Sequence, residues 1–300
     1  MKNVYQLSDL ANRDLLDADA EKPAKLAVIG APVAHSASPQ MHQAALDELN
    51  IDTRYIRLEV PPGSVAEAIT QMKQLGFIGC NVTVPHKFEV MDCCDELTDD
   101  AKALGAVNTI IFGDKTIGHN TDAPGLVEAI KEDFDADVSD LNIMILGTGG
   151  GAGKAVATQC ARMNCPNLWL VNRTVSKAQE LADQLNESQT TTTVSVLAPT
   201  SPSMNDATQT AQLIINATSL GLKEGDPLPI DESQLHSGLF VYDMIYNPSQ
   251  TELLKNAEAK GAHTANGFTM LLHQGVLAFQ AWFPDTSPLE AMRKGLSSTL

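Results

Sequence analysis

The sequence predicts an α/β protein of two domains, in which helices cover mostly parallel sheets. Its 300 residues exceed the usual size of a single hydrophobic core, although one large α/β unit is an alternative. Apolar runs typical of strands alternate with helical patterns, and this alternation indicates parallel sheets. A glycine-rich turn at residues 147–152 lies between an apolar run and a helical pattern, as in Rossmann-type domains that bind dinucleotides.

Composition and charge argue against several classes of function. The formal net charge of −17 disfavours a general affinity for nucleic acid or for an anionic membrane, because both need basic patches. No apolar run approaches the ~20 residues of a membrane span, and the polar, acidic start of the chain is unlike a secretory signal. The five cysteines form no CxxC pair, so we expect reduced thiols, a cytoplasmic location and no metal site. The expected partner is a small molecule, and both a monomer and a homodimer fit the sequence.

The first α/β series begins at Lys25, after 22 or so residues that fit either a short helix or a loose tail. Ser38 suits a helix N-cap with Pro39 at the first helical position. Gly113 and Asp114 lie between two apolar runs, which predicts a hairpin. We expect strands at 25–30, 53–60, 79–84, 107–112 and 115–120, and helical segments after Ser38, around Ile69, through Phe88 and Met91, and near Ala101.

The second series contains the glycine-rich turn. Its expected strands are 141–147, 168–171, 213–218 and 239–246. A helix carrying Ala152, Val156 and Cys160 follows the turn, and a final helical stretch at 268–283 lies beyond the series.

The turn GTGGGA matches the pattern G-x-G-x-x-A, and its position between strand and helix makes the match useful. Glycines let backbone N–H groups approach a pyrophosphate, and the helix N-terminus adds about half a positive charge. A glycine loop without a ligand is the plain alternative. The cofactor-binding residues predicted here are Gly147, Thr148, Gly149, Gly150, Gly151 and Ala152.

The residues after the next strand favour NADP(H) over NAD(H). An NAD enzyme usually places Asp or Glu there to bind the ribose hydroxyl, whereas this chain has Asn172, Arg173 and Thr174, with Lys177 close behind. An arginine can pair with a 2′-phosphate and stack on the adenine. The alternative is that Arg173 is a solvated surface residue.

Polar residues gather at other expected strand ends, where open sheets bind ligands. In the second series Thr218 and Met244 lie at or near the ends of expected strands, and such strand ends would face a nicotinamide, although alone these residues could be turn and core residues. In the first series each residue also has a structural alternative, such as an N-cap for Ser38 and Asp122 or a turn for Asn108. The candidates in the first series are Ser36, Ser38, Asn81, Thr83, Lys87, Asn108 and Asp122.

Taken in order, the motifs of this chain resemble the shikimate dehydrogenase family, which reduces 3-dehydroshikimate with NADPH. The resemblance runs from about residue 28 to 283, so the first 22 or so residues and the last stretch lie outside it. The departures within it are small: Lys177 stands where arginine is frequent, and His119 precedes the NTD motif, where several residue types are tolerated. It implies a step of chorismate and aromatic amino acid biosynthesis. The matching motifs are GAPVAHSASP, NVTVPHK, GAVNT, NTD, GTGGGA, NRT with a basic residue three on, NATS, YDMIY and Gly267 to Gln274.

The resemblance also implies residue roles. Ser36 and Ser38 would bind the substrate carboxylate, and Lys87 with Asp122 would form the catalytic pair. The expected substrate-binding and catalytic domain is 1–122 with 268–300, and the expected NADP-binding Rossmann domain is 123–267. Further implied substrate contacts are Asn81, Thr83, Asn108, Asp122, Tyr246 and Gln274. Further implied cofactor contacts are Asn172, Arg173, Thr174, Lys177, Met244 and Gly267.

Two alternatives to this activity stay open on the sequence. One is a broader quinate/shikimate dehydrogenase that uses NAD(H) or both cofactors, and the other is a non-catalytic dinucleotide sensor. His86 is the rival to Lys87 as the proton donor, but adjacent side chains diverge in direction, and the resemblance selects Lys87.

Overall fold

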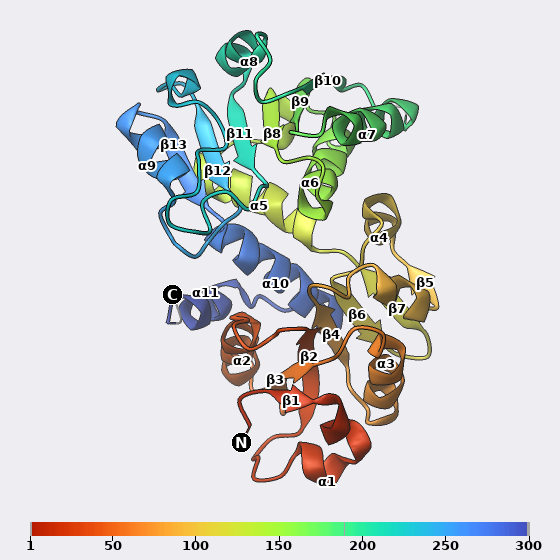
Figure 1. Cartoon of the computed structure of the whole chain (residues 1–300). Coiled ribbons are helices and arrows are strands. Elements are labelled where there is room, and N and C mark those ends of the chain that lie inside the picture. The colour runs from red at the N-terminus through yellow and green to blue at the C-terminus, as the bar shows by residue number, and fades with distance from the viewer. Residues whose placement is uncertain (1, 189, 299–300) are drawn as a thin grey trace. The chain divides into compact units, whose positions relative to one another are not determined.

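The computed structural model describes residues 2–188 and 190–298, which form two compact units (Figure 1). The first unit comprises the chain up to Asp122 together with the part from Leu272 onward, and the second comprises Ala123–Leu271. Each unit has its own sheet and its own buried apolar clusters. The predicted α/β class with two parallel-rich sheets is confirmed.

The first unit contains a seven-stranded sheet in the order β1-β3-β2-β4-β6-β7-β5. Every neighbouring pair is parallel except β4–β6 and β6–β7, which are antiparallel. The β6–β7 pair is the hairpin predicted around Gly113 and Asp114. The strands are β1 (Tyr5–Gln6), β2 (Ala24–Gly30), β3 (Arg54–Glu59), β4 (Gly79–Val82), β5 (Glu96–Leu97), β6 (Thr109–Phe112) and β7 (Thr116–His119).

Helices cover this sheet with apolar faces that follow the helical period. In α3 (Val65–Gln74), Val65, Ala68, Ile69 and Met72 are buried, which is the spacing of one helix face. The segment predicted as a helix through Phe88 and Met91 is instead a short 3-10 helix, Glu89–Cys93. The other helices are α1 (Arg13–Leu16), α2 (Ser38–Glu48), α4 (Asp99–Leu104), α10 (Phe268–Trp282), α11 (Leu289–Ser297) and the 3-10 helix Leu7–Ala11.

The second unit contains a fully parallel six-stranded sheet in the order β10-β9-β8-β11-β12-β13. Counted from β8, this is the order 3-2-1-4-5-6 of dinucleotide-binding Rossmann sheets. The strands are β8 (Ile143–Leu146), β9 (Asn167–Val171), β10 (Thr193–Leu197), β11 (Leu213–Asn216), β12 (Phe240–Asp243) and β13 (His263–Asn266). The helices are α5 (Asp122–Phe134), α6 (Gly151–Arg162), α7 (Val175–Glu187), α8 (Met204–Thr210) and α9 (Glu252–Ala259), with 3-10 turns at Val138–Asp140 and Glu232–Gln234.

Two strands of the second sheet were not predicted, and one helix start was predicted wrongly. β10 and β13 are the edge strands and are only partly buried. Polar residues interrupt the apolar ones in both, TVSVL in β10 and HTAN in β13, so neither has the continuous apolar run of a fully buried strand. Ser38 is the first residue of α2 rather than its N-cap, because Ala37 precedes the helix and Ser38 itself is buried. The difference is one residue, and it leaves the Ser38 side chain without a capping role.

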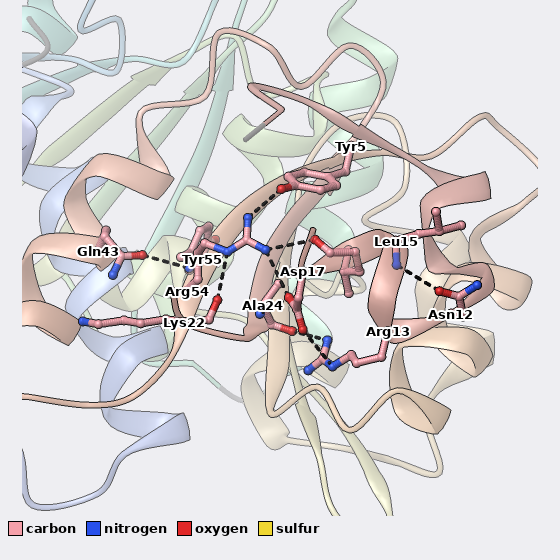
Figure 2. Close-up of polar contacts among 11 residues, drawn as sticks. Tyr5, Asn12, Arg13, Leu15, Asp17, Lys22, Ala24, Gln43, Arg54 and Tyr55 are labelled. Atoms are coloured by element: carbon pink, nitrogen blue, oxygen red, sulfur yellow. Dashed lines mark hydrogen bonds and ion pairs between the residues drawn. The ribbon is translucent and has the colours of Figure 1, made fainter. Parts of the chain in front are cut away.

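The N-terminal stretch is ordered by Arg54, which lies at the start of β3 (Figure 2). Its guanidinium donates to the Tyr5 hydroxyl at 2.6 Å, to the Leu16 carbonyl oxygen at 3.0 Å and to the Asp17 carboxylate at 3.1 Å. Its Nε also donates to the Lys22 carbonyl oxygen at 3.3 Å. A buried guanidinium needs such a set of acceptors, so this one side chain fixes a stretch for which the sequence offered two alternatives.

In the part of the chain that the structure describes, no helix combines the length and apolar character that crossing a membrane requires.

Candidate active site

Lys87 and Asp122 form an ion pair in the first unit. The Lys87 Nζ lies 2.6 Å from the Asp122 Oδ2, and the two side chains are 28% and 23% exposed. The backbone fixes both residues, since the Lys87 carbonyl oxygen accepts from the Val107 N–H and the Asp122 N–H donates to the Asn120 Oδ1. Asp122 is therefore the first residue of α5 whose carboxylate holds the lysine, and the N-cap alternative does not describe its contacts.

The sheet brings this pair together from 35 residues apart. β4 and β7 both pair antiparallel with β6, so β4 and β7 run in the same direction and end at the same edge of the sheet. Lys87 follows the end of β4, and Asp122 follows the end of β7. This edge is where open α/β sheets place ligands.

His86 has its contact with the backbone at Val60. Its side chain is fully buried, and its Nε2 lies 2.7 Å from the Val60 carbonyl oxygen. A carbonyl only accepts, so Nε2 carries the hydrogen and is occupied in holding the backbone. The structure thus gives His86 a structural contact and leaves Lys87 as the partly exposed cation of NVTVPHK.

The side-chain amides of Asn81 and Asn108, which were predicted as substrate contacts, also form hydrogen bonds that hold the strand ends. The Asn81 Oδ1 accepts from the Tyr55 hydroxyl at 2.7 Å, and its Nδ2 donates to the Thr109 hydroxyl at 3.1 Å. The Asn108 Oδ1 accepts from the Thr121 N–H at 2.9 Å, and its Nδ2 donates to the Thr121 hydroxyl at 2.9 Å. Asn108 therefore secures the backbone directly before Asp122.

Ser36 and Ser38 lie between β2 and the first turn of α2. The Ser36 Oγ accepts from the Ser38 N–H at 3.3 Å, so its hydroxyl hydrogen stays available for a ligand. Thr83 follows β4 and is partly exposed, and its N–H donates to the Ile29 carbonyl oxygen, which places the end of β4 beside the end of β2. These hydroxyls belong to the same carboxyl edge of the first sheet as Lys87.

The two remaining predicted substrate contacts lie on other elements. Gln274 is a buried residue of α10 in the first unit. Tyr246 follows β12 in the second unit and is partly exposed.

The glycine turn has the shape that its sequence predicted. Gly147 has φ of +94°, in the region that favours glycine, and a Cβ there would lie 2.6 Å from the Thr218 Cγ2. Gly150 precedes α6 without a side-chain cap, so the first N–H groups of the helix are free for an anion. Gly153 was not predicted, although a Cβ there would lie 2.4 Å from the Gly147 carbonyl oxygen. A dinucleotide pyrophosphate fits this turn because the uncapped backbone N–H groups at the start of α6 can donate to it.

The residues predicted to select the cofactor lie between β9 and α7. The Asn172 Oδ1 accepts from the Gly149 N–H at 3.1 Å, so Asn172 holds the glycine turn. Arg173, Thr174 and Lys177 are exposed, and in the described residues neither basic side chain is in an ion pair. Two unpaired cations close to the turn fit a phosphate on the ribose.

The strand ends of the second sheet are joined by buried polar groups. Asn216 donates to the Asp243 Oδ1 at 3.0 Å, and its own Oδ1 accepts from the Thr218 hydroxyl at 2.7 Å. Burial raises the pKa of Asp243, against three hydrogen bonds that favour the carboxylate. Gly267 lies against Met244, because a Cβ at Gly267 would lie 2.2 Å from the Met244 carbonyl oxygen. These contacts place Thr218 beside Gly147 and Met244 beside Gly267, at the same edge of the second sheet.

Comparison with known proteins adds the family. Residues 28–110 match "Shikimate dehydrogenase substrate binding domain", residues 128–221 match "Shikimate / quinate 5-dehydrogenase", and residues 267–295 match "Shikimate 5'-dehydrogenase C-terminal domain". The shikimate dehydrogenase (NADP(+)) of Methanopyrus kandleri is 38% identical over 272 residues, which are 90% of this chain and 93% of the relative. The chain belongs to the shikimate dehydrogenase family.

Solved structures of this family and of a quinate enzyme share the fold. Shikimate 5-dehydrogenase from Thermus thermophilus, in complex with NADP(H) and shikimate, matches with a TM-score of 0.81 and 31% identity over 92% of this chain and 100% of that one. Quinate dehydrogenase from Corynebacterium glutamicum, in complex with NAD, matches with a TM-score of 0.82 and 30% identity over 91% of this chain and 98% of that one.

Two residues that interact with Asn81 were not predicted. Tyr55 and His42 stack with ring centroids 4.5 Å apart, and both are buried. Burial holds the pKa of Tyr55 well above its usual value, so the phenol stays protonated and donates to Asn81. Burial lowers the pKa of His42 to about 3, and a weak contact with Asn81, short of a normal hydrogen bond, opposes this slightly. Nothing in the sequence marks these two residues except that they lie on elements adjacent to predicted site residues.

We expect His42 to make folding sensitive to acid. The unfolded chain binds a proton at this ring near pH 6.5, but the folded protein does so only near pH 3, so stability falls as the pH drops through this interval. Between about pH 7 and about pH 5, the free energy of unfolding should fall by about 2 kcal/mol more in the wild type than in His42→Phe, which keeps an aromatic ring against Tyr55. Urea titrations at both pH values measure this, and equal losses in the two proteins would contradict the assignment.

Proposed function

We propose that this protein catalyses the reversible, NADPH-dependent reduction of 3-dehydroshikimate to shikimate. The observation that carries the proposal is the Lys87–Asp122 ion pair at the carboxyl edge of the first sheet. A polar pair of this kind supplies what a carbonyl reduction needs from the protein, namely a proton donor beside a group that orients it. The proposed location is the cytoplasm.

The substrate carboxylate is proposed to bind the hydroxyls of Ser36 and Ser38. Neutral donors suit a protein of net charge −17, because they hold an anion without a dedicated cation. The ring hydroxyls and the reacting centre would meet the polar side chains at the same edge. In the first unit these are Asn81, Thr83, Asn108, Asp122 and Gln274.

NADP(H) is proposed to bind the second unit at the carboxyl edge of its sheet. The N–H groups at the start of α6 and residues 147–152 would hold the pyrophosphate. Asn172, Arg173, Thr174 and Lys177 would surround the adenosine phosphate, and Thr218, Met244 and Gly267 would lie at the nicotinamide end. When bound, the reduced cofactor supplies the hydride.

Lys87 is proposed to deliver the proton of the reaction. Its ammonium donates a hydrogen bond to the C3 oxygen of the substrate and stabilises the negative charge that develops there. The proton then moves from Nζ to that oxygen as the carbonyl becomes a hydroxyl. Asp122 holds the ammonium in place, and because Lys87 is partly exposed it can regain a proton from solvent.

Two alternatives share this scaffold. A quinate/shikimate dehydrogenase with NAD is favoured by the likeness to the quinate dehydrogenase of Corynebacterium glutamicum, but Arg173 and Lys177 favour a phosphorylated cofactor. A non-catalytic dinucleotide sensor has no use for the ion pair, so the Lys87–Asp122 contact argues against it.

Initial rates with shikimate and with quinate, each in the presence of NADP⁺ and of NAD⁺, test the proposed activity. We expect shikimate with NADP⁺ to give the highest kcat/KM of the four combinations. Higher turnover of quinate with NAD⁺ would favour the quinate enzyme, and no turnover in any combination would favour the sensor.

Removal of the proton donor is expected to lower kcat more than it changes the KM for shikimate. Lys87→Ala should lose about 10² or more in kcat, the range for a general acid. Lys102→Ala, which removes a more exposed lysine paired with Asp99 in the same unit, is the matched control and should leave kcat unchanged. His86→Gln keeps an N–H donor for the Val60 carbonyl oxygen. A loss of kcat in His86→Gln as large as in Lys87→Ala would transfer the role to His86.

A further inference from the structure

Arg57 on β3 directs its guanidinium at the loop that carries Ser36. Its Nε and Nη2 donate to the Ser36 carbonyl oxygen at 3.0 and 2.7 Å. Nη2 also donates to the Gln40 Oε1 at 2.9 Å, and Nη1 donates to the Asn3 Oδ1 at 3.2 Å. Four of the five N–H groups of the guanidinium are therefore engaged by the protein itself. This leaves the side chain little capacity to bind a substrate directly.

The contact fixes the geometry of the loop. Two donors on one oxygen hold the Ser36 carbonyl, and because the peptide unit is planar they also fix the orientation of the Ser36–Ala37 peptide. The Ser36 N–H donates to the Val33 carbonyl oxygen, and the Ser36 Oγ accepts from the Ser38 N–H. The contact with Gln40 ties the same guanidinium to the first turn of α2, directly after Ser38. Both serines are thus held on one rigid support.

We propose that Arg57 is a positioning residue that holds the Ser36–Ser38 loop in the conformation that binds the substrate carboxylate, without touching the substrate. This inference rests on the proposed function. The positive charge of Arg57 behind the loop also reduces the cost of bringing a carboxylate into a protein with an excess of acidic residues. The neighbouring Arg54 on the same strand serves a different purpose, because its contacts anchor the N-terminal stretch.

Arg57→Met keeps an unbranched side chain as far as the position of Nε and removes the guanidinium with all of its donors. We expect the KM for shikimate to rise about 10-fold, with kcat changed by less than about 3-fold and the KM for NADP⁺ unchanged, which is the pattern of lost uniform substrate binding. The readout specific to the carboxylate is the ratio of dissociation constants for shikimate methyl ester and shikimate, measured by calorimetry. The wild type should prefer the acid, and the variant should lose most of this preference.

Arg57→Lys keeps the charge but replaces the planar guanidinium by a single donating nitrogen, so its KM should lie between those of the wild type and Arg57→Met. If Arg57→Met does not fold, the Arg57→Lys variant provides the test instead. An unchanged KM and an unchanged ester-to-acid ratio in the variant that folds would overturn the inference.

Two controls separate loop positioning from anchoring of the N-terminal stretch. Arg54→Lys should lower the thermal midpoint and leave the KM for shikimate unchanged, because it weakens the contacts of Arg54 with Tyr5 and Lys22 in the N-terminal stretch. Asn3→Ala removes only the exposed partner of Arg57 and should keep the KM within about 2-fold of the wild type. A rise of KM in either control as large as in Arg57→Met would also overturn the inference. If the wild type does not oxidise shikimate, the proposed function fails; if it does and only the Arg57 effects are missing, the inference alone fails.

Discussion

The contact between Lys87 and Asp122 is the interaction on which the proposed chemistry depends, and much of the first unit serves to form it. Neither residue lies within a strand, and each follows one. The antiparallel strand β6 lies between β4 and β7, so that their carboxyl ends meet. The Val107 N–H and the Asn120 side chain then fix the two backbones. A partly exposed ion pair contributes little to stability alone, so this arrangement is better understood as serving function.

The polar groups around this pair are held mainly by one another. Asn81 is occupied by Tyr55 and Thr109, and Asn108 by Thr121. A buried amide whose partners are all present is rigid, because releasing it would leave donors and acceptors unpaired. The same logic applies in the second unit, where Asp243 and Asn216 hold Thr218. Preorganised polar edges of this kind suit transition-state stabilisation, since little reorganisation is needed during the reaction.

The sequence predicted features that have a local signature. Neighbouring residues are enough to recognise the glycine turn, the strands with apolar runs and the order of motifs. The structure contains the turn and these strands. The strands β10 and β13 were missed because a partly buried edge strand needs no continuous apolar run. The contacts of Arg54 and Arg57 were not predicted, since nothing local reveals that a side chain will bind backbone oxygens distant in sequence. Gly153 was missed because its requirement comes from the packing of the helix on Gly147.

The most direct test of the central claim is a double-mutant cycle of Lys87→Met and Asp122→Asn, measured as kcat/KM for shikimate oxidation. If the two side chains act as one proton-donating unit, adding Asp122→Asn to Lys87→Met should change kcat/KM by no more than about 3-fold beyond the worse single variant. Fully independent losses, in which the effects of the two single variants multiply in the double variant, would contradict the account.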